Sequence, residues 1–278
     1  MGKLFWRTIK ENKYAIPPGH TPTSLTAELF DYLGSTDPEL RDEIGYGVFA
    51  NFLERGYYSE EEIAIYIANL LANLEIGIGE NEADSVFLRS FSILFLAEIV
   101  HNDNKVPRLK RAITKTILEK ALWYLAAERD PRGFVQEKGW AHALAHTADL
   151  LLVLGKSLNT GKLQHQRILK GIREKLILSI HWVFIYGEDD RLSRAALEIL
   201  RRNTLPSTFI HNWLKSFLEP GGGDWKDAWA EEETARAFFN VRNFLRSLYL
   251  QVTTEDGLLL QEELENMILE TVQKLRPY

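Results

Sequence analysis

Hydrophobic positions along the chain follow a helical period almost throughout. Apolar residues recur at every third or fourth position, while alternating β-branched runs are scarce. Helix starts are marked by Thr-Pro at 21–22, by Asp-Pro at 37–38 and by a capping box that opens at Ser59. The pattern therefore predicts an all-α protein.

Several of the predicted helices open with a similar motif, which indicates an internal repeat. An acidic residue precedes an arginine and an apolar helix at Asp37–Arg41, Asp84–Arg89 and Asp189–Arg194. This opening resembles HEAT-like repeats, in which a ladder of buried arginines joins adjacent helical pairs. We expect second helices, and then a final pair, at about 59–74, 106–127, 163–185, 206–218, 231–251 and 257–275.

The repeat predicts an α-α superhelix of about five HEAT-like helical pairs, and a closed α/α toroid is the alternative. We expect one all-helical domain over residues 1–278, with a short N-terminal extension at 1–20. Pro220–Gly223 is the only linker-like run, and the helical pattern resumes near residue 231. In a superhelix of this type, the inner helices line a concave surface that binds ligands or partners.

One predicted inner helix carries polar residues in an otherwise apolar setting. His142, His146 and Asp149 are spaced as i, i+4 and i+7, which places them along one side of a helix. The rest of this helix is apolar nearly all round, Trp140 included, and such a helix is usually buried. Buried imidazoles and carboxylates need partners or a ligand, so the sequence predicts a site here.

Other charged residues are expected to complete this site. Arg89 lies on the preceding inner helix, and we place it in the wall or rim together with Glu128, Asp130, Lys138 and Asp189. His142, His146 and Asp149 would form the floor. We expect a small polar ligand, with an anion as a candidate, because Arg and Lys pair with carboxylate or phosphate.

The same histidines fit three other interpretations. His142 and His146 at i, i+4 are candidate ligands of a divalent metal, although Asp149 would be a stretched third ligand. All three are candidate catalytic residues for acid–base chemistry. Alternatively, the histidines are structural and the concave surface binds a protein partner. The spacing alone does not choose between them.

The composition of the chain limits the classes of partner and the cellular compartment that we expect. The chain has 278 residues and a net charge of −6, which disfavours a nucleic acid or an anionic membrane as partner. It has no cysteine, which excludes disulfides and thiolate chemistry and suits a reducing cytoplasm. No apolar run approaches the roughly 20 residues that span a bilayer. We expect a soluble cytoplasmic protein.

Several strings of residues, the late Phe244-Leu-Arg-Ser-Leu-Tyr249 among them, resemble the bacterial family called domain of unknown function 2785. The most specific is Lys138-Gly-Trp-Ala-His-Ala-Leu-Ala-His-Thr-Ala-Asp149; others are Arg89-Ser-Phe-Ser92, Glu128-Arg-Asp130 and Glu188-Asp-Asp-Arg191. The similarity extends over about 20–275. It implies a bacterial, cytoplasmic, all-helical protein whose signature coincides with the predicted site, and it implies no activity.

Overall fold

The computed structural model describes residues 1–178, 180–220 and 225–275. Helices make up nearly all of its regular structure, which confirms the all-α prediction. The chain forms two compact units, Met1–Leu150 and Leu151–Tyr278, each considered by itself below. The superhelix, the toroid, the HEAT-like pairing and the single domain stay predictions.

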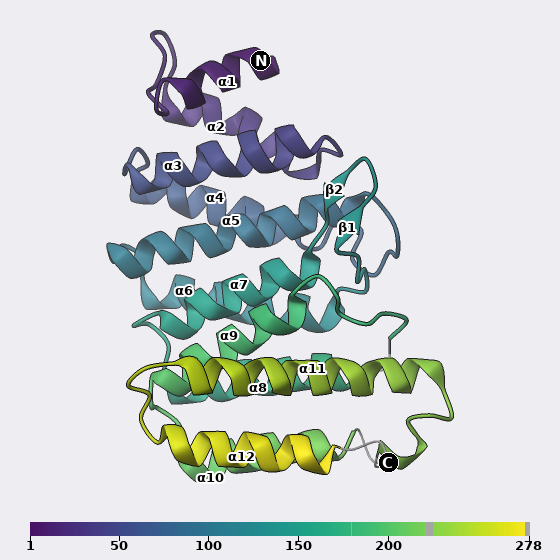
Figure 1. Cartoon of the computed structure of the whole chain (residues 1–278). Helices are drawn as coiled ribbons and strands as arrows, with labels where there is room; N and C mark the ends of the chain where they lie inside the picture. The colour runs from purple at the N-terminus through teal and green to yellow at the C-terminus, as the bar shows by residue number, and fades with distance from the viewer. Residues whose placement is uncertain (179, 221–224, 276–278) are drawn as a thin grey trace. The chain divides into compact units, whose positions relative to one another are not determined.

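The first unit consists of α-helices and one small hairpin (Figure 1). Its α-helices are α1 (Lys3–Glu11), α2 (Pro22–Asp31), α3 (Gly47–Glu54), α4 (Glu60–Asn73), α5 (Ser85–Lys105), α6 (Arg111–Ala127) and the beginning of α7 (Ala143–Lys156). The first unit also contains a 3-10 helix at Tyr32–Gly34 and a π-helix at Glu39–Tyr46. Its two antiparallel strands are β1 (Phe134–Val135) and β2 (Gly139–Trp140).

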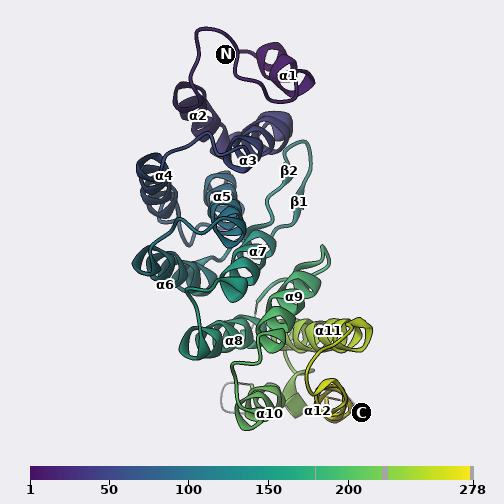
Figure 2. The same ribbon diagram turned by 90° about the vertical axis from the view of Figure 1, so that its left-hand side faces the viewer.

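The second unit is built around α11, which packs against both α9 and α12 (Figure 2). Its α-helices after α7 are α8 (Lys162–Ile177), α9 (Glu188–Arg201), α10 (Ser207–Lys215), α11 (Glu232–Thr254) and α12 (Gln261–Lys274). Short 3-10 helices span Ser216–Leu218 and Trp225–Asp227. The linker-like run predicted at Pro220–Gly223 falls mainly outside the described residues.

Helix starts that depend on local capping are where the sequence placed them. Thr21 and Ser59 each accept a hydrogen bond from the backbone three residues on, and each completes a capping box. Asp37 also accepts hydrogen bonds from the next turn, at 3.0 Å from the Glu39 nitrogen. A π-helix follows it, however, and the α-helix expected there begins only at Gly47.

Two predicted helices are shorter than expected. The helix predicted from 106 begins at Arg111, because Val106 precedes a proline and has an extended backbone. The helix predicted to reach 185 ends at Ile177, where the next residue is also extended. Residues near a proline or an extended break leave the helical region even where the apolar period continues.

Helix α5 is the core helix of the first unit. It packs against α3, α4 and α6, and the rings of Phe49 and Phe95 stack 4.4 Å apart at its centre. By length and composition α5 is apolar enough to cross a membrane, yet 67% of that window is buried inside the protein. Such burial is expected of a core helix in a water-soluble protein.

The three repeated arginines are not equivalent. Arg41 and Arg89 are completely buried, as a ladder of repeat arginines requires. Arg194 has 61% of its side chain exposed and pairs with Asp190 on the same helix. The prediction of a third buried arginine is therefore wrong, because position 194 lies on the solvent side of α9.

Candidate functional site

The segment before α7 is a hairpin instead of the predicted helix. Strand β1 pairs with β2 so that Phe134 lies opposite Trp140, and α7 begins only at Ala143. His142 therefore precedes the helix, which corrects the prediction that it lies on a helical turn. Its carbonyl still accepts the hydrogen bond of the His146 nitrogen at 2.9 Å, so the two histidines stay one turn apart.

Three residues of this hairpin have a left-handed backbone. The φ angles of Glu137, Gly139 and His142 are +64°, +76° and +52°. A Cβ atom at Gly139 would lie 2.9 Å from Cβ of Pro38, so both the backbone angle and the close approach require glycine. The left-handed conformation is unfavourable for Glu and His, and the surrounding structure must stabilise it.

Arg41 supplies this stabilisation from the π-helix. Its Nη2 donates hydrogen bonds to the carbonyls of Lys138, at 2.8 Å, and Trp140, at 3.3 Å. Its guanidinium carbon lies 4.2 Å and 4.8 Å from the ring centres of Phe87 and Phe91. The buried repeat arginine therefore holds the hairpin against α5, and Figures 1 and 2 show β2 beside the beginning of that helix.

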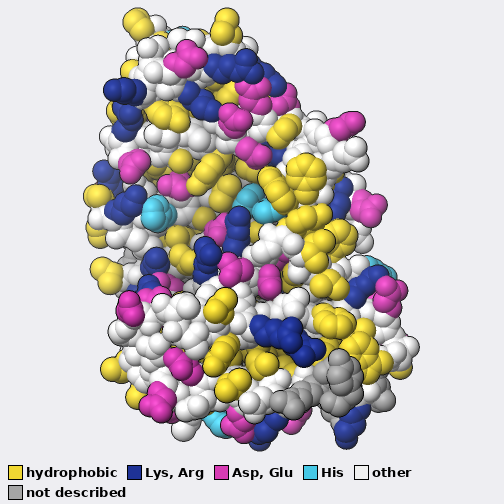
Figure 3. All heavy atoms as spheres, in the orientation of Figure 1, with side chains coloured by type: hydrophobic (Ala, Val, Ile, Leu, Met, Phe, Trp, Pro, Cys, Tyr) yellow, Lys and Arg dark blue, Asp and Glu magenta, His cyan; other side chains and the backbone are white. Residues whose placement is uncertain are grey.

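The hairpin presents aromatic side chains at the surface. Trp140 is 40% exposed and Phe134 is 50% exposed, with ring centres 5.0 Å apart. The prediction that Trp140 packs in the core is wrong, because Trp140 lies on strand β2 and not on a buried helix. In Figure 3 apolar side chains gather over the hairpin, next to histidine surface.

The two histidines lie beneath these rings. The ring centre of His142 is 4.3 Å from that of Trp140 and 5.7 Å from that of His146. Each histidine is 7% exposed. Nδ1 of His146 lies 2.9 Å from the hydroxyl of Ser90, and its ring meets Phe91 edge to face. Phe134, Trp140, His142 and His146 are called the aromatic–histidine cluster from here on.

Asp149 is half-buried on α7 and influences a residue that the sequence reasoning missed. Tyr46 donates a hydrogen bond to Glu98 at 3.0 Å. Burial raises the pKa of Tyr46, and the charges of Glu98 and then Asp149 raise it further. A lone tyrosine in a predicted helix gives no sequence signal of this neighbourhood.

Arg89 and Glu128, both predicted ligand contacts, are bonded to each other. Nε and Nη2 of Arg89 donate to the Glu128 carboxylate at 2.7 Å and 3.1 Å. Nη1 donates to the carbonyls of Ile76 and Gly77. Burial opposes the charge of Glu128, but these bonds and a backbone bond from Asp130 outweigh it, so the pKa of Glu128 is lowered. This geometry is that of a buried structural ion pair.

The remaining predicted contacts in the first unit are also paired within the chain. Asp130 forms an ion pair with Arg132 at 2.6 Å. Lys138 forms one with Asp84 at 2.7 Å, and both side chains are partly exposed. The cations expected to meet an anionic ligand are thus neutralised by carboxylates of the same unit.

Asp189 belongs to the second unit, in the first turn of α9. It is half-buried, and burial raises the pKa of Asp189. Its backbone position is favourable for a carboxylate at a helix start. Its place in a site with His142 and His146 stays a prediction.

The histidine pair does not gain a third metal ligand from the part of the chain that the structure describes. Within residues 1–178, 180–220 and 225–275, no group of three or more His, Asp or Glu side chains is arranged to hold a metal ion. Asp149 is therefore not shown to complete a site with His142 and His146. Structural and catalytic metal sites usually have at least three protein ligands.

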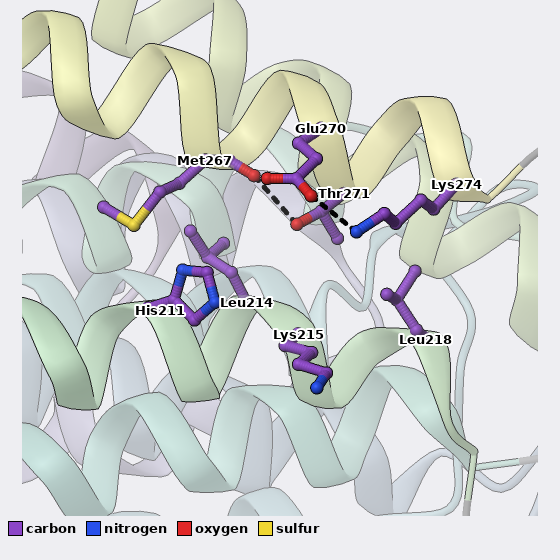
Figure 4. A pocket seen from close by; sticks show the side chains of 8 residues that line it. All are labelled: His211, Leu214, Lys215, Leu218, Met267, Glu270, Thr271 and Lys274. Carbon is purple, nitrogen blue, oxygen red and sulfur yellow. Dashed lines mark hydrogen bonds and ion pairs between the residues drawn. The ribbon is translucent and has the colours of Figure 1, made fainter.

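Two cavities lie away from the predicted site residues. One, of about 110 Å³, lies between α10 and α12 (Figure 4). In that view His211 and Lys215 face Met267 and the ion-paired Glu270 across the cavity. The other, of about 200 Å³, lies beside the beginning of α4 in the first unit and is lined by Glu60, Glu61, Ile63, Ala64, Arg108, Leu109, Lys110 and Ile113.

A family model described as "Protein of unknown function (DUF2785)" matches residues 74–250. The chain belongs to this family. The matched stretch includes α5, the hairpin and α7, and hence every predicted site residue. No curated protein and no solved structure matches the chain. DUF2785 membership confirms the resemblance seen in the sequence and assigns no activity.

Proposed function

We propose that this DUF2785 protein binds a small polar ligand at the aromatic–histidine cluster. The observation that carries the proposal is an exposed indole, Trp140, laid 4.3 Å from the nearly buried ring of His142. Small-molecule sites are lined mainly by aromatic and apolar side chains with a few placed polar groups, and the cluster has this composition. Phe134, 50% exposed, lies beside this indole with the ring centres 5.0 Å apart, so the exposed apolar surface is shared by two rings.

The backbone of the hairpin supports the same proposal. His142 has a left-handed φ, and Arg41 is buried beneath the hairpin with two hydrogen bonds to it. Residues with an unfavourable backbone conformation persist only where many surrounding contacts hold them. Such residues are common at ligand sites, where they fix the contacting groups in place before binding. The proposed site is therefore rigid before any ligand arrives.

The ion pairs of the first unit do not favour an anionic ligand. Arg89 is engaged by Glu128, and Lys138 is engaged by Asp84. An anion would have to compete with carboxylates that are already in place. We therefore propose a neutral polar ligand in preference to the anionic candidate, in a protein that acts in the bacterial cytoplasm.

A thermal-shift screen of the full chain against sugars, nucleosides, amino acids and organic acids tests the proposal. A ligand at 100 times its Kd stabilises the folded protein by about 2.7 kcal/mol. We expect the shift to disappear in Trp140→Ala and His146→Gln. Trp123→Ala is the matched control, because Trp123 on α6 is 39% exposed and outside the cluster. Shifts that survive both cluster variants would contradict the proposal.

A protein-binding role is the second candidate function, and the exposure of Phe134 and Trp140 favours it. Aromatic residues at the surface are enriched at protein interfaces. In this case the histidines are structural and pin α7 to α5. A partner whose capture is lost with Trp140→Ala and kept with Trp123→Ala would support this role.

An enzyme that uses the histidines for metal-dependent or acid–base chemistry stays the third candidate. Metal analysis of protein purified without a histidine tag tests its metal-dependent form. Stoichiometric metal that is lost in His142→Ala would support it. Metal at low occupancy that does not respond to this substitution would count against it.

A further inference from the structure

Ser90 of α5 and His146 of α7 form a buried hydrogen-bonded contact. Ser90 is completely buried. Its hydroxyl lies 2.9 Å from Nδ1 of His146, and its carbonyl oxygen lies 3.3 Å from the same nitrogen. The Ser90 hydroxyl also donates a hydrogen bond to the carbonyl of Ala141, at the end of the hairpin.

Only one placement of the hydrogens is consistent with these hydrogen bonds. A serine hydroxyl has a single proton, and a carbonyl oxygen can only accept. The Ser90 proton is directed at Ala141, so toward His146 the hydroxyl is an acceptor. The carbonyl of Ser90 is an acceptor as well. Nδ1 of His146 faces two acceptors and must carry the hydrogen.

We propose that Ser90 is a positioning residue that holds neutral His146 as the Nδ1–H tautomer. The lone pair of the ring is then on Nε2. Phe91 adds to the orientation, because its ring meets the imidazole at 83° with centres 5.1 Å apart. A serine on the core helix thereby determines the chemistry that a histidine on the next helix offers.

This assignment also specifies a ligand class, and that part rests on the proposed function. A ring nitrogen with a lone pair accepts hydrogen bonds, so a ligand group that meets Nε2 is a hydroxyl, an amino group or another donor. A carboxylate or phosphate offers only acceptors and would be repelled by the lone pair. The ligand group at His146 is therefore a donor.

Long-range ¹H–¹⁵N correlation spectra of the labelled full chain at about pH 8, above the ordinary histidine pKa, report the tautomer directly. The His146 signals are identified by their loss in His146→Gln. We expect a protonated-type Nδ1 and a lone-pair-type Nε2. Hydrogen on Nε2, or an average of both tautomers, would overturn the assignment whatever the ligand proves to be.

Ser90→Ala tests the origin of the tautomer. We expect the two nitrogen signals of His146 to move toward each other. Ser92→Ala is the matched control, because Ser92 is an equally buried serine on α5 that bonds to Asn73 instead. Unchanged His146 signals in Ser90→Ala would overturn the role of the hydroxyl. If this variant does not fold, the spectrum of the unaltered chain still shows whether His146 is the Nδ1–H tautomer.

The thermal-shift screen tests the ligand class separately. We expect compounds that lose their shift in His146→Gln to carry a hydroxyl or amino group. A set of such compounds made up only of carboxylates and phosphates without a donor would overturn the ligand class. The spectra are recorded without ligand, so they can succeed even where the proposed function fails.

Discussion

We expect His165 of α8 to make the second unit sensitive to mild acid. Its side chain is completely buried. Nδ1 lies 2.6 Å from the Thr204 hydroxyl, and Nε2 lies 3.3 Å from the Thr160 hydroxyl. Burial, and next the charge of Arg202, lowers the pKa of His165 from 6.5 to about 4. No carboxylate takes part in these two bonds, so the neutral ring is the form that fits.

The sign of the effect follows from the two protonation equilibria. The unfolded chain takes up a proton at the ordinary pKa of 6.5, whereas the folded chain resists it until the pH approaches about 4. The stability that neutral His165 contributes is present above pH 6.5 and is lost as the pH falls. Lowering the pKa of His165 from 6.5 to about 4 corresponds to about 3 kcal/mol of stability in full, of which about 2 kcal/mol is lost by pH 5.

His165→Gln removes the titration and keeps an amide that can bond to both threonines. The variant is expected to be less stable at pH 7, by about 1–3 kcal/mol, because its fit to the buried site is imperfect. Between pH 7 and pH 5 this difference should shrink by about 2 kcal/mol, as measured by urea unfolding followed by far-UV circular dichroism.

His211→Gln provides the control substitution, because it also removes a histidine of the second unit but at an exposed position. A constant difference for His165→Gln would refute the reasoning. It would mean that the folded state admits a proton on His165 as easily as the unfolded state.

Two further predictions concern the anchors of the first unit. Arg89→Met should destabilise the protein by about 3–5 kcal/mol in thermal or urea unfolding, because it leaves Glu128 charged and buried. Adding Glu128→Gln to this variant should recover part of the lost stability. Arg194→Met changes an exposed arginine and should alter stability by about 0.5 kcal/mol or less. Equal losses of stability in Arg89→Met and Arg194→Met would contradict the interpretation of Arg89–Glu128 as a buried ion pair. Gly139→Ala should cost about 2 kcal/mol or more, since the left-handed φ and the contact with Pro38 both oppose a Cβ atom. Gly187→Ala is the control, because Gly187 has a φ of +83° and nothing within 4 Å of its Cβ position, and it should cost about 1 kcal/mol. A loss of stability in Gly139→Ala smaller than that in Gly187→Ala would show that the hairpin moves to accommodate a Cβ atom.

The sequence determined the features that depend on local interactions. The capping boxes at Thr21 and Ser59 join atoms three residues apart, so their geometry is written in adjacent residues. The apolar period likewise predicted α11 and α12 to within a few residues. The histidine pair also stayed one turn apart, because the His142 carbonyl accepts the first hydrogen bond of α7.

Only the tertiary structure decided where the chain leaves the helical period. The hairpin before α7 is held by Arg41, 97 residues away from Lys138 along the chain, and no local pattern encodes that hydrogen bond. The glycine at 139 was a visible signal, but its meaning depends on the approach of Pro38. The same holds for the repeated arginines, since burial at 41 and 89 and exposure at 194 follow from which helices cover each position. Side chains that are alike in sequence acquire different roles because folding chooses their partners.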